Sequence, residues 1–286
     1  MQEPGGDNIV AVKIGTASKP DTTEQIRKNQ ERIIKISTNK LSAFLKTKFE
    51  SPILEIKEDN GPTHQTGIVD GKKTVILRPK SFIERGREIP TDRTIHEVAH
   101  CIEDDFLGLD LNRETDSVWY FGEGFAECIT IDDPANIREE LNIGKETGSY
   151  ERIREEVVSN STFGNTLQEY MRLDKLFAVR QPELEPDQLS ESLDNKSMVP
   201  YNVGSSLVRF IIEKGGIDKL KAIMRKVQIQ KKYAHGWEVA KNATLQELNN
   251  EEERVRNLLK ESLNEQFGDV DAFEQEWRAA VLGKKN

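Results

Sequence analysis

Strand-like patterns in this chain are confined to its first third, and most of the remaining sequence has helical periodicity. Residues 8–15 and 52–57 favour extended strands. Thr66–Val69 and Thr74–Leu77 flank an Asp-Gly pair, which is typical of the turn of a β-hairpin. This order predicts an α+β fold with a small N-terminal mixed β-sheet and helices, followed by a mostly helical C-terminal part.

The helices are expected in many separate segments, because polar residues, glycines and prolines interrupt the apolar periodicity. Residues 181–199 are polar and contain prolines, which indicates a long surface connection. The expected helices cover about 23–48, 91–106, 119–132, 135–142, 149–158, 164–178, 201–214, 216–231, 236–241, 245–266 and 270–282.

Composition excludes several classes of protein. The 286 residues carry a formal net charge of −9 and no long Lys/Arg block, which argues against a nucleic-acid-binding surface. No apolar run approaches the roughly 20 residues of a membrane-spanning helix. Two cysteines are too few for a disulfide scaffold. We therefore expect a soluble protein, either cytoplasmic or a secreted mature chain lacking its leader.

One short segment carries the chemistry of a metal site. His96-Glu97-Val98-Ala99-His100 is an HExxH motif, and positions i and i+4 of a helix share one face. His96 and His100 can therefore bind one Zn²⁺ ion through two imidazole nitrogens. Glu97 is rotated away from them and can act as general base on a zinc-bound water. The alternative without a metal-binding function is a helix that carries two surface histidines at this spacing by chance.

The apolar residues Ile95, Val98, Ile102 and Phe106 form a separate stripe that can bury this helix while the histidines face a cleft. Cys101 directly follows His100, and Cys128 directly follows Glu127. The two cysteines are either buried free thiols or a disulfide pair.

Downstream of the motif, Tyr120-Phe121-Gly122-Glu123-Gly124-Phe125-Ala126 resembles the second motif of the gluzincin metallopeptidases. The segments 201–216 and 267–278 resemble C-terminal helices of the same superfamily. The resemblance implies a thermolysin-like catalytic architecture with Glu123 as the third zinc ligand. Glu127 would accept a hydrogen bond from His96, where thermolysin-like proteins use Asp. Without the resemblance, Glu123 and Glu127 are an ordinary i,i+4 pair of exposed acids.

The same resemblance assigns two further roles. Gluzincins use a downstream Tyr or His to stabilise the oxyanion, and Tyr201 is the best match by position, ahead of Tyr233 and His235. Gly67, Ile68 and Val69 occupy the place of the edge strand that pairs with the substrate backbone.

The sequence thus predicts a zinc-dependent metallopeptidase, by default an endopeptidase, whose partner is a peptide or protein substrate. We expect an N-terminal segment at 1–22, an α+β zinc-binding subdomain at 23–132, and a helical subdomain at 133–286 that completes the cleft. Two alternatives stay open at this point: a non-catalytic zinc-containing interaction module, and a zinc hydrolase of non-peptide amides. Oligomeric state, compartment and cleavage preference stay open as well.

Overall fold

The computed structural model describes residues 23–59, 64–85, 88–107, 119–176, 199–229 and 245–283. Several expectations lie outside these residues. They are the strand at 8–15, the segment 1–22, most of the connection 181–199, the helix at 236–241, and the two alternatives to Tyr201.

The described strands form one small mixed sheet, as the sequence predicts. The order is β1-β3-β2, in which β1 (Ile53–Ile56) runs parallel to β3 (Lys72–Leu77) and β2 (His64–Val69) pairs with β3 antiparallel. Asp70 and Gly71 join β2 to β3 with φ values of 52° and 72°. A tight two-residue turn of the primed kind needs positive φ at both positions, and Asp and Gly tolerate it.

Two helices cover this sheet and build the first part of the core. In α1 (Thr23–Phe44) the buried apolar residues recur at helical spacing, and this face packs against α3 (Thr91–Leu107). The predicted apolar stripe of α3 is confirmed, since Ile95, Val98, Ile102 and Phe106 are all at most 1% exposed. α3 also contacts β2 and β3, so the helix that carries the histidines is fixed on two sides.

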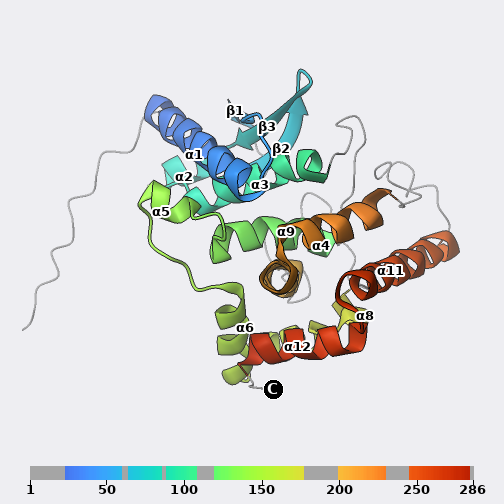
Figure 1. Cartoon of the computed structure of the whole chain (residues 1–286). Coiled ribbons are helices and arrows are strands. Elements are labelled where there is room, and N and C mark those ends of the chain that lie inside the picture. Colours follow the sequence, from blue (N-terminus) through green and yellow to red (C-terminus); the bar gives the residue numbers. More distant parts are fainter. Residues whose placement is uncertain are drawn as a thin grey trace, which may run out of the picture.

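The rest of the described chain is helical, and Figure 1 shows the sheet and α1 at one end of the molecule and α6, α11 and α12 at the other. The π-helical turns are η1 (Cys128–Asp132) and η4 (Pro200–Gly204). The α-helices are α2 (Lys80–Glu84), α4 (Trp119–Glu127), α5 (Ile137–Leu141), α6 (Ser149–Val158), α7 (Thr162–Tyr170), α8 (Leu173–Leu176), α9 (Ser205–Ile229), α11 (Leu245–Phe267) and α12 (Val270–Leu282).

Most predicted helix boundaries agree with these bounds, but the single helix expected at 164–178 is two helices, α7 and α8, because the chain leaves the helical conformation after Tyr170. α9 includes the predicted break between two helices, because Gly216 has φ 77° and leaves the helical conformation inside it. The α+β class is confirmed. The expected thermolysin-like architecture is not what these elements form, since the described sheet has only the three strands above.

A single hydrophobic cluster runs from α1 to α12. At its far end Trp277 of α12 is fully buried, and its indole Nε1 donates a hydrogen bond to Ser206 Oγ of α9 at 3.2 Å. The cluster includes residues on both sides of the expected 132/133 boundary, and that division stays a prediction.

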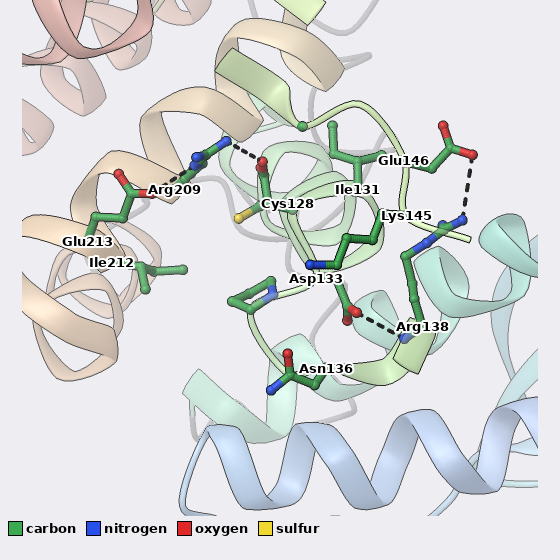
Figure 2. Close-up of a pocket in the computed structure, with 13 residues that line it drawn as sticks. Cys128, Ile131, Asp133, Asn136, Arg138, Lys145, Glu146, Arg209, Ile212 and Glu213 are labelled. Carbon is green, nitrogen blue, oxygen red and sulfur yellow. Dashed lines mark hydrogen bonds and ion pairs between the residues drawn. The ribbon is translucent and has the colours of Figure 1, made fainter. Parts of the chain in front are cut away.

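Arg209 of α9 links this helix to η1 and α6, and Figure 2 shows its contact with Glu213. Its guanidinium donates to Asp132 at 2.8 Å, to Glu151 at 3.1 Å and to Glu213 at 2.8 Å, and it lies 3.9 Å from the centre of the Tyr150 ring. These residues stand beside a cavity of about 340 Å³ whose lining includes Asp132, Arg209 and Glu213. Because Arg209 is held by three carboxylates, we assign it a structural role.

No helix among the described residues is long and apolar enough to cross a membrane.

Candidate metal site

The histidines of the HExxH segment lie on one face of α3, where they meet across a single turn. His96 Nε2 and His100 Nε2 are 3.1 Å apart, and the two rings are edge-on with an interplanar angle of 79°. The helix brings these atoms together because residues four apart are stacked along its axis.

Glu123 of α4 completes the group from a second helix. Its Oε2 lies 3.2 Å from His96 Nε2 and 3.5 Å from His100 Nε2. In the part of the chain that the structure describes, these three residues form the one group whose ligand atoms could share a metal ion. The structure therefore brings together the three residues that the sequence singled out.

The separations within this group fit a small tetrahedral ion. With metal–nitrogen distances of 2.0–2.1 Å, the edge of a tetrahedron around Zn²⁺ is about 3.3–3.4 Å. The three measured donor–donor distances, 3.1, 3.2 and 3.5 Å, cluster around that value. Two imidazoles and one carboxylate are also a donor set that catalytic zinc sites use.

A carboxylate stands behind each histidine. His96 Nδ1 lies 3.3 Å from Glu127 Oε2, and His100 Nδ1 lies 3.7 Å from Glu103 Oε2. In the tautomer that has the proton on Nδ1 of each imidazole, that proton is on the side of the carboxylate and both Nε2 lone pairs face each other. Such a pair of lone pairs at 3.1 Å is favourable only with a cation between them, either a metal ion or a proton.

The pKa shifts of His96, His100 and Glu123 also show which charges this site favours. Burial opposes the charged form of His96, but hydrogen bonds to Glu123 and Glu127 outweigh it and raise its pKa. Burial likewise opposes charge on His100, yet Glu103 and Glu123 raise its pKa well above the usual value. Burial also disfavours ionisation of Glu123, but both histidines hold the pKa of this carboxyl far below its usual range. The pocket thus favours positive charge at its centre.

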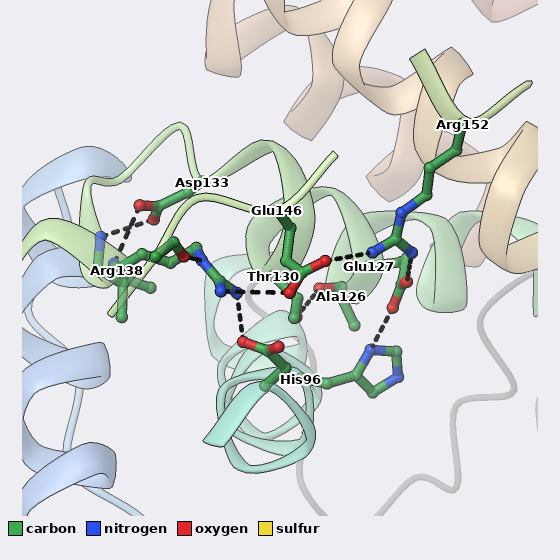
Figure 3. Close-up of polar contacts among 11 residues, drawn as sticks. His96, Ala126, Glu127, Thr130, Asp133, Arg138, Glu146 and Arg152 are labelled. Atoms are coloured by element: carbon green, nitrogen blue, oxygen red, sulfur yellow. Dashed lines mark hydrogen bonds and ion pairs between the residues drawn. The ribbon is translucent and has the colours of Figure 1, made fainter. Parts of the chain in front are cut away.

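Glu127 is in turn held by a chain of alternating charges (Figure 3). Arg152 Nη1 lies 3.3 Å from Glu127 Oε1, and Arg152 Nη2 lies 3.2 Å from Glu146 Oε2. Arg138 continues the chain from Glu146 at 3.5 Å to Asp92 at the start of α3. The chain ties the loop between α5 and α6 to both helices of the site.

Glu97 is 9% exposed and is not a member of the three-residue group. Burial raises its pKa, although the nearby His100 and His96 oppose that effect. A raised carboxyl pKa brings a group closer to the working range of a general base near neutral pH.

Tyr201 reaches the site from the π-helical turn η4. Its ring is stacked near that of His96, with centroids 6.0 Å apart. Burial, and then the charge of Glu123, raise the pKa of Tyr201 above its usual value, so the phenol stays protonated as a donor. Tyr201 was predicted from its position in the sequence, and the fold places its ring near that of His96.

The close approach that delivers Tyr201 depends on Gly124. A Cβ at this position would lie 2.5 Å from the carbonyl carbon of Gly204 in η4. Gly124 thus permits the close contact between α4 and η4.

A cavity of about 340 Å³ opens beside this group. Its lining includes His96 and Tyr201 together with Arg93, Asn202 and Ile131. A ligand in this cavity would therefore contact both a candidate metal ligand and the candidate oxyanion donor.

β2, which holds Gly67, Ile68 and Val69, is an outer strand of the described sheet. Ile68 is 54% exposed, and β2 contacts α3. These positions are thus placed where an added strand could pair. His64 lies partly buried at the start of β2.

Sequence reasoning missed Glu103, Arg93 and the chain of charges around Glu127. Glu103 follows His100 by three residues, and this i,i+3 spacing on a helix was a usable signal. Cys101 and Cys128 are both buried and free, so the disulfide alternative is not what the structure shows.

Comparisons of the chain with protein-family models, with curated proteins and with solved structures find no match. The similarity of the two motifs to gluzincins therefore stays a prediction from the residues themselves.

Proposed function

We propose that this chain is a zinc-dependent peptidase whose metal ligands are His96, His100 and Glu123. The observation that carries the proposal is the convergence of three donor atoms at tetrahedral-edge distances, with a carboxylate behind each imidazole. The proposal rests on this site and on the gluzincin-like motifs. A thermolysin-like arrangement of the whole catalytic unit is not needed for it.

Zn²⁺ in this position supplies a Lewis acid that lowers the pKa of water and polarises a carbonyl. The residues of the chain supply the proton transfers. Glu97 accepts the proton of the attacking water and delivers it to the nitrogen of the departing amine. Tyr201 donates a hydrogen bond to the carbonyl oxygen as negative charge develops on it.

Glu127 and Glu103 act on the imidazoles rather than on the substrate. Each carboxylate faces the Nδ1 of its histidine, at 3.3 Å for Glu127 and 3.7 Å for Glu103, and thereby favours the tautomer that leaves Nε2 free for a metal. An outer β2 strand at Gly67–Val69 gives an extended peptide a backbone edge to pair with.

The decisive experiment combines metal analysis with peptide hydrolysis. Protein purified without chelator is expected to hold about one zinc per chain and to cleave members of an unbiased peptide library. Glu97→Gln should keep the zinc and lose about 10²–10⁴-fold in kcat/KM, which is the usual contribution of a general base. Glu139→Gln, an exposed substitution of the same type on α5, is the matched control.

The outcomes separate the alternatives. No stoichiometric zinc would refute the metal site. Zinc without hydrolysis of any peptide would favour the non-catalytic module or a non-peptide amide substrate. Unchanged cleavage by Glu97→Gln would refute the assignment of the base.

A further inference from the structure

The cavity beside the candidate metal site contains several charged side chains, and nearly all of them are paired. Asp92 pairs with Arg138, and Arg152 lies between Glu127 and Glu146. Arg93 is different: it lines the cavity and is exposed, and no ion pair or hydrogen bond joins its guanidinium to another described residue. Among the described residues that line the cavity, Arg93 is therefore the cation whose guanidinium is not engaged in an ion pair.

The position of Arg93 on α3 places its charge close to the candidate metal ligand His96 and the candidate base Glu97. It precedes His96 by three residues and Glu97 by four, so their Cβ atoms are about 5–6 Å apart on neighbouring helical faces. Its charge also acts on the acid–base groups of the site, since it opposes the raised pKa values of both Glu97 and Tyr201. A ligand group bound by Arg93 would lie within one or two residues of the reacting bond.

A free guanidinium in a cavity is best matched by a planar anion. A carboxylate can accept two parallel N–H bonds from the guanidinium fork, and such charge-assisted pairs are about twice as strong as neutral hydrogen bonds. The apolar lining beside it, Ile131 and Pro90, is suited to the aliphatic part of a side chain.

We propose that Arg93 binds a carboxylate of the peptide substrate and makes the site selective for an acidic group close to the scissile bond. This inference rests on the proposed function and names its substrate class. The carboxylate has two sources in a peptide: the side chain of an Asp or Glu residue, or the free C-terminus.

Binding to the Glu97→Gln variant tests this without turnover. Four fluorescent peptides of one sequence are compared, with Glu or Gln near the centre and with a free or amidated C-terminus. We expect the peptide with the required carboxylate to bind about 10- to 100-fold more tightly than its neutral counterpart, and this preference to weaken with salt. The pair of peptides that differs in affinity identifies the source of the carboxylate.

Charge reversal separates recognition from folding. In the same background, Arg93→Gln should abolish the preference, and Arg93→Glu should shift it toward peptides with Lys at the same position. Arg27→Glu, a reversal of an exposed arginine on α1, should leave the preference unchanged. Equal affinity for all four peptides, or an unchanged preference in Arg93→Glu, would overturn the inference.

The two proposals fail in different ways. If wild-type protein cleaves or binds acidic and neutral peptides equally, only the role of Arg93 is refuted. If the protein holds no zinc and cleaves nothing, the proposed function is refuted, whatever the binding preference.

Discussion

A single methyl group at position 124 is expected to damage the candidate metal site without touching a ligand. In Gly124→Ala the new Cβ lies 2.5 Å from the carbonyl carbon of Gly204, 2.8 Å from its oxygen and 3.0 Å from its Cα. Non-bonded carbon atoms prefer about 3.5–4.0 Å, so α4 and η4 must separate by about 1 Å. The clash is with backbone, so no change of side-chain rotamer can relieve it.

The magnitude follows from two opposing effects. Overpacking of a tight contact costs up to about 3 kcal/mol, and a backbone clash belongs at that upper end. Alanine recovers about 1 kcal/mol through its better helix propensity. We therefore expect the free energy of unfolding to fall by about 2 kcal/mol. Glu123 precedes the substituted residue, and Tyr201 lies on the turn that must move, so zinc affinity and turnover should fall as well.

Urea unfolding of the metal-free protein measures the first effect, and zinc titration against a competing chelator measures the second. Gly144→Ala is the matched control, because nothing lies within 4 Å of the added methyl. Its stability should change by no more than about 0.5 kcal/mol. Wild-type stability and zinc affinity in Gly124→Ala would show that the α4–η4 contact is not as close as described.

Two further predictions concern single side chains. Glu103→Gln weakens the acceptor behind His100 and should lower zinc affinity about 10-fold in the chelator titration. Asp105→Asn on the same helix is the control and should leave zinc affinity unchanged. Equal zinc affinities of the two variants would contradict the role of Glu103. Burial, followed by nearby positive charge, lowers the pKa of His64 from 6.5 to about 4. Between these values the unfolded chain binds a proton that the folded chain does not, so stability falls as pH falls, by up to about 3 kcal/mol. His64→Gln should flatten this fall in urea titrations of metal-free protein, and an unchanged slope would refute the assignment.

Local patterns in the sequence were sufficient for most of the secondary structure. The apolar spacing of α3 depends only on residues within one helix, and the Asp70-Gly71 turn depends on two residues that tolerate positive φ. The break at Gly216 is of the same kind. These features are local because the backbone conformation of a few adjacent residues determines them.

The relation between distant elements was beyond such reasoning. The stacking of Tyr201 on His96 requires α4 and η4 to touch at Gly124 and Gly204. A glycine in a helix has several explanations in sequence, and only the fold shows which backbone it meets. For the same reason the sequence could name a third ligand at Glu123 only through a resemblance.

The chain of charges from Asp92 to Glu127 shows what such distant pairing adds to the site. A single partly exposed ion pair contributes little to stability, because solvent screens it and ordering two side chains costs entropy. Arg152, however, holds Glu127 from the side opposite to His96. It thereby fixes the carboxylate that orients the imidazole. The loop between α5 and α6, which supplies Glu146, consequently bears on the geometry of a histidine far away in sequence. This loop contributes to the site by positioning His96. Neither the spacing of charges nor a motif could reveal that contribution, because the residues involved are far apart in the sequence.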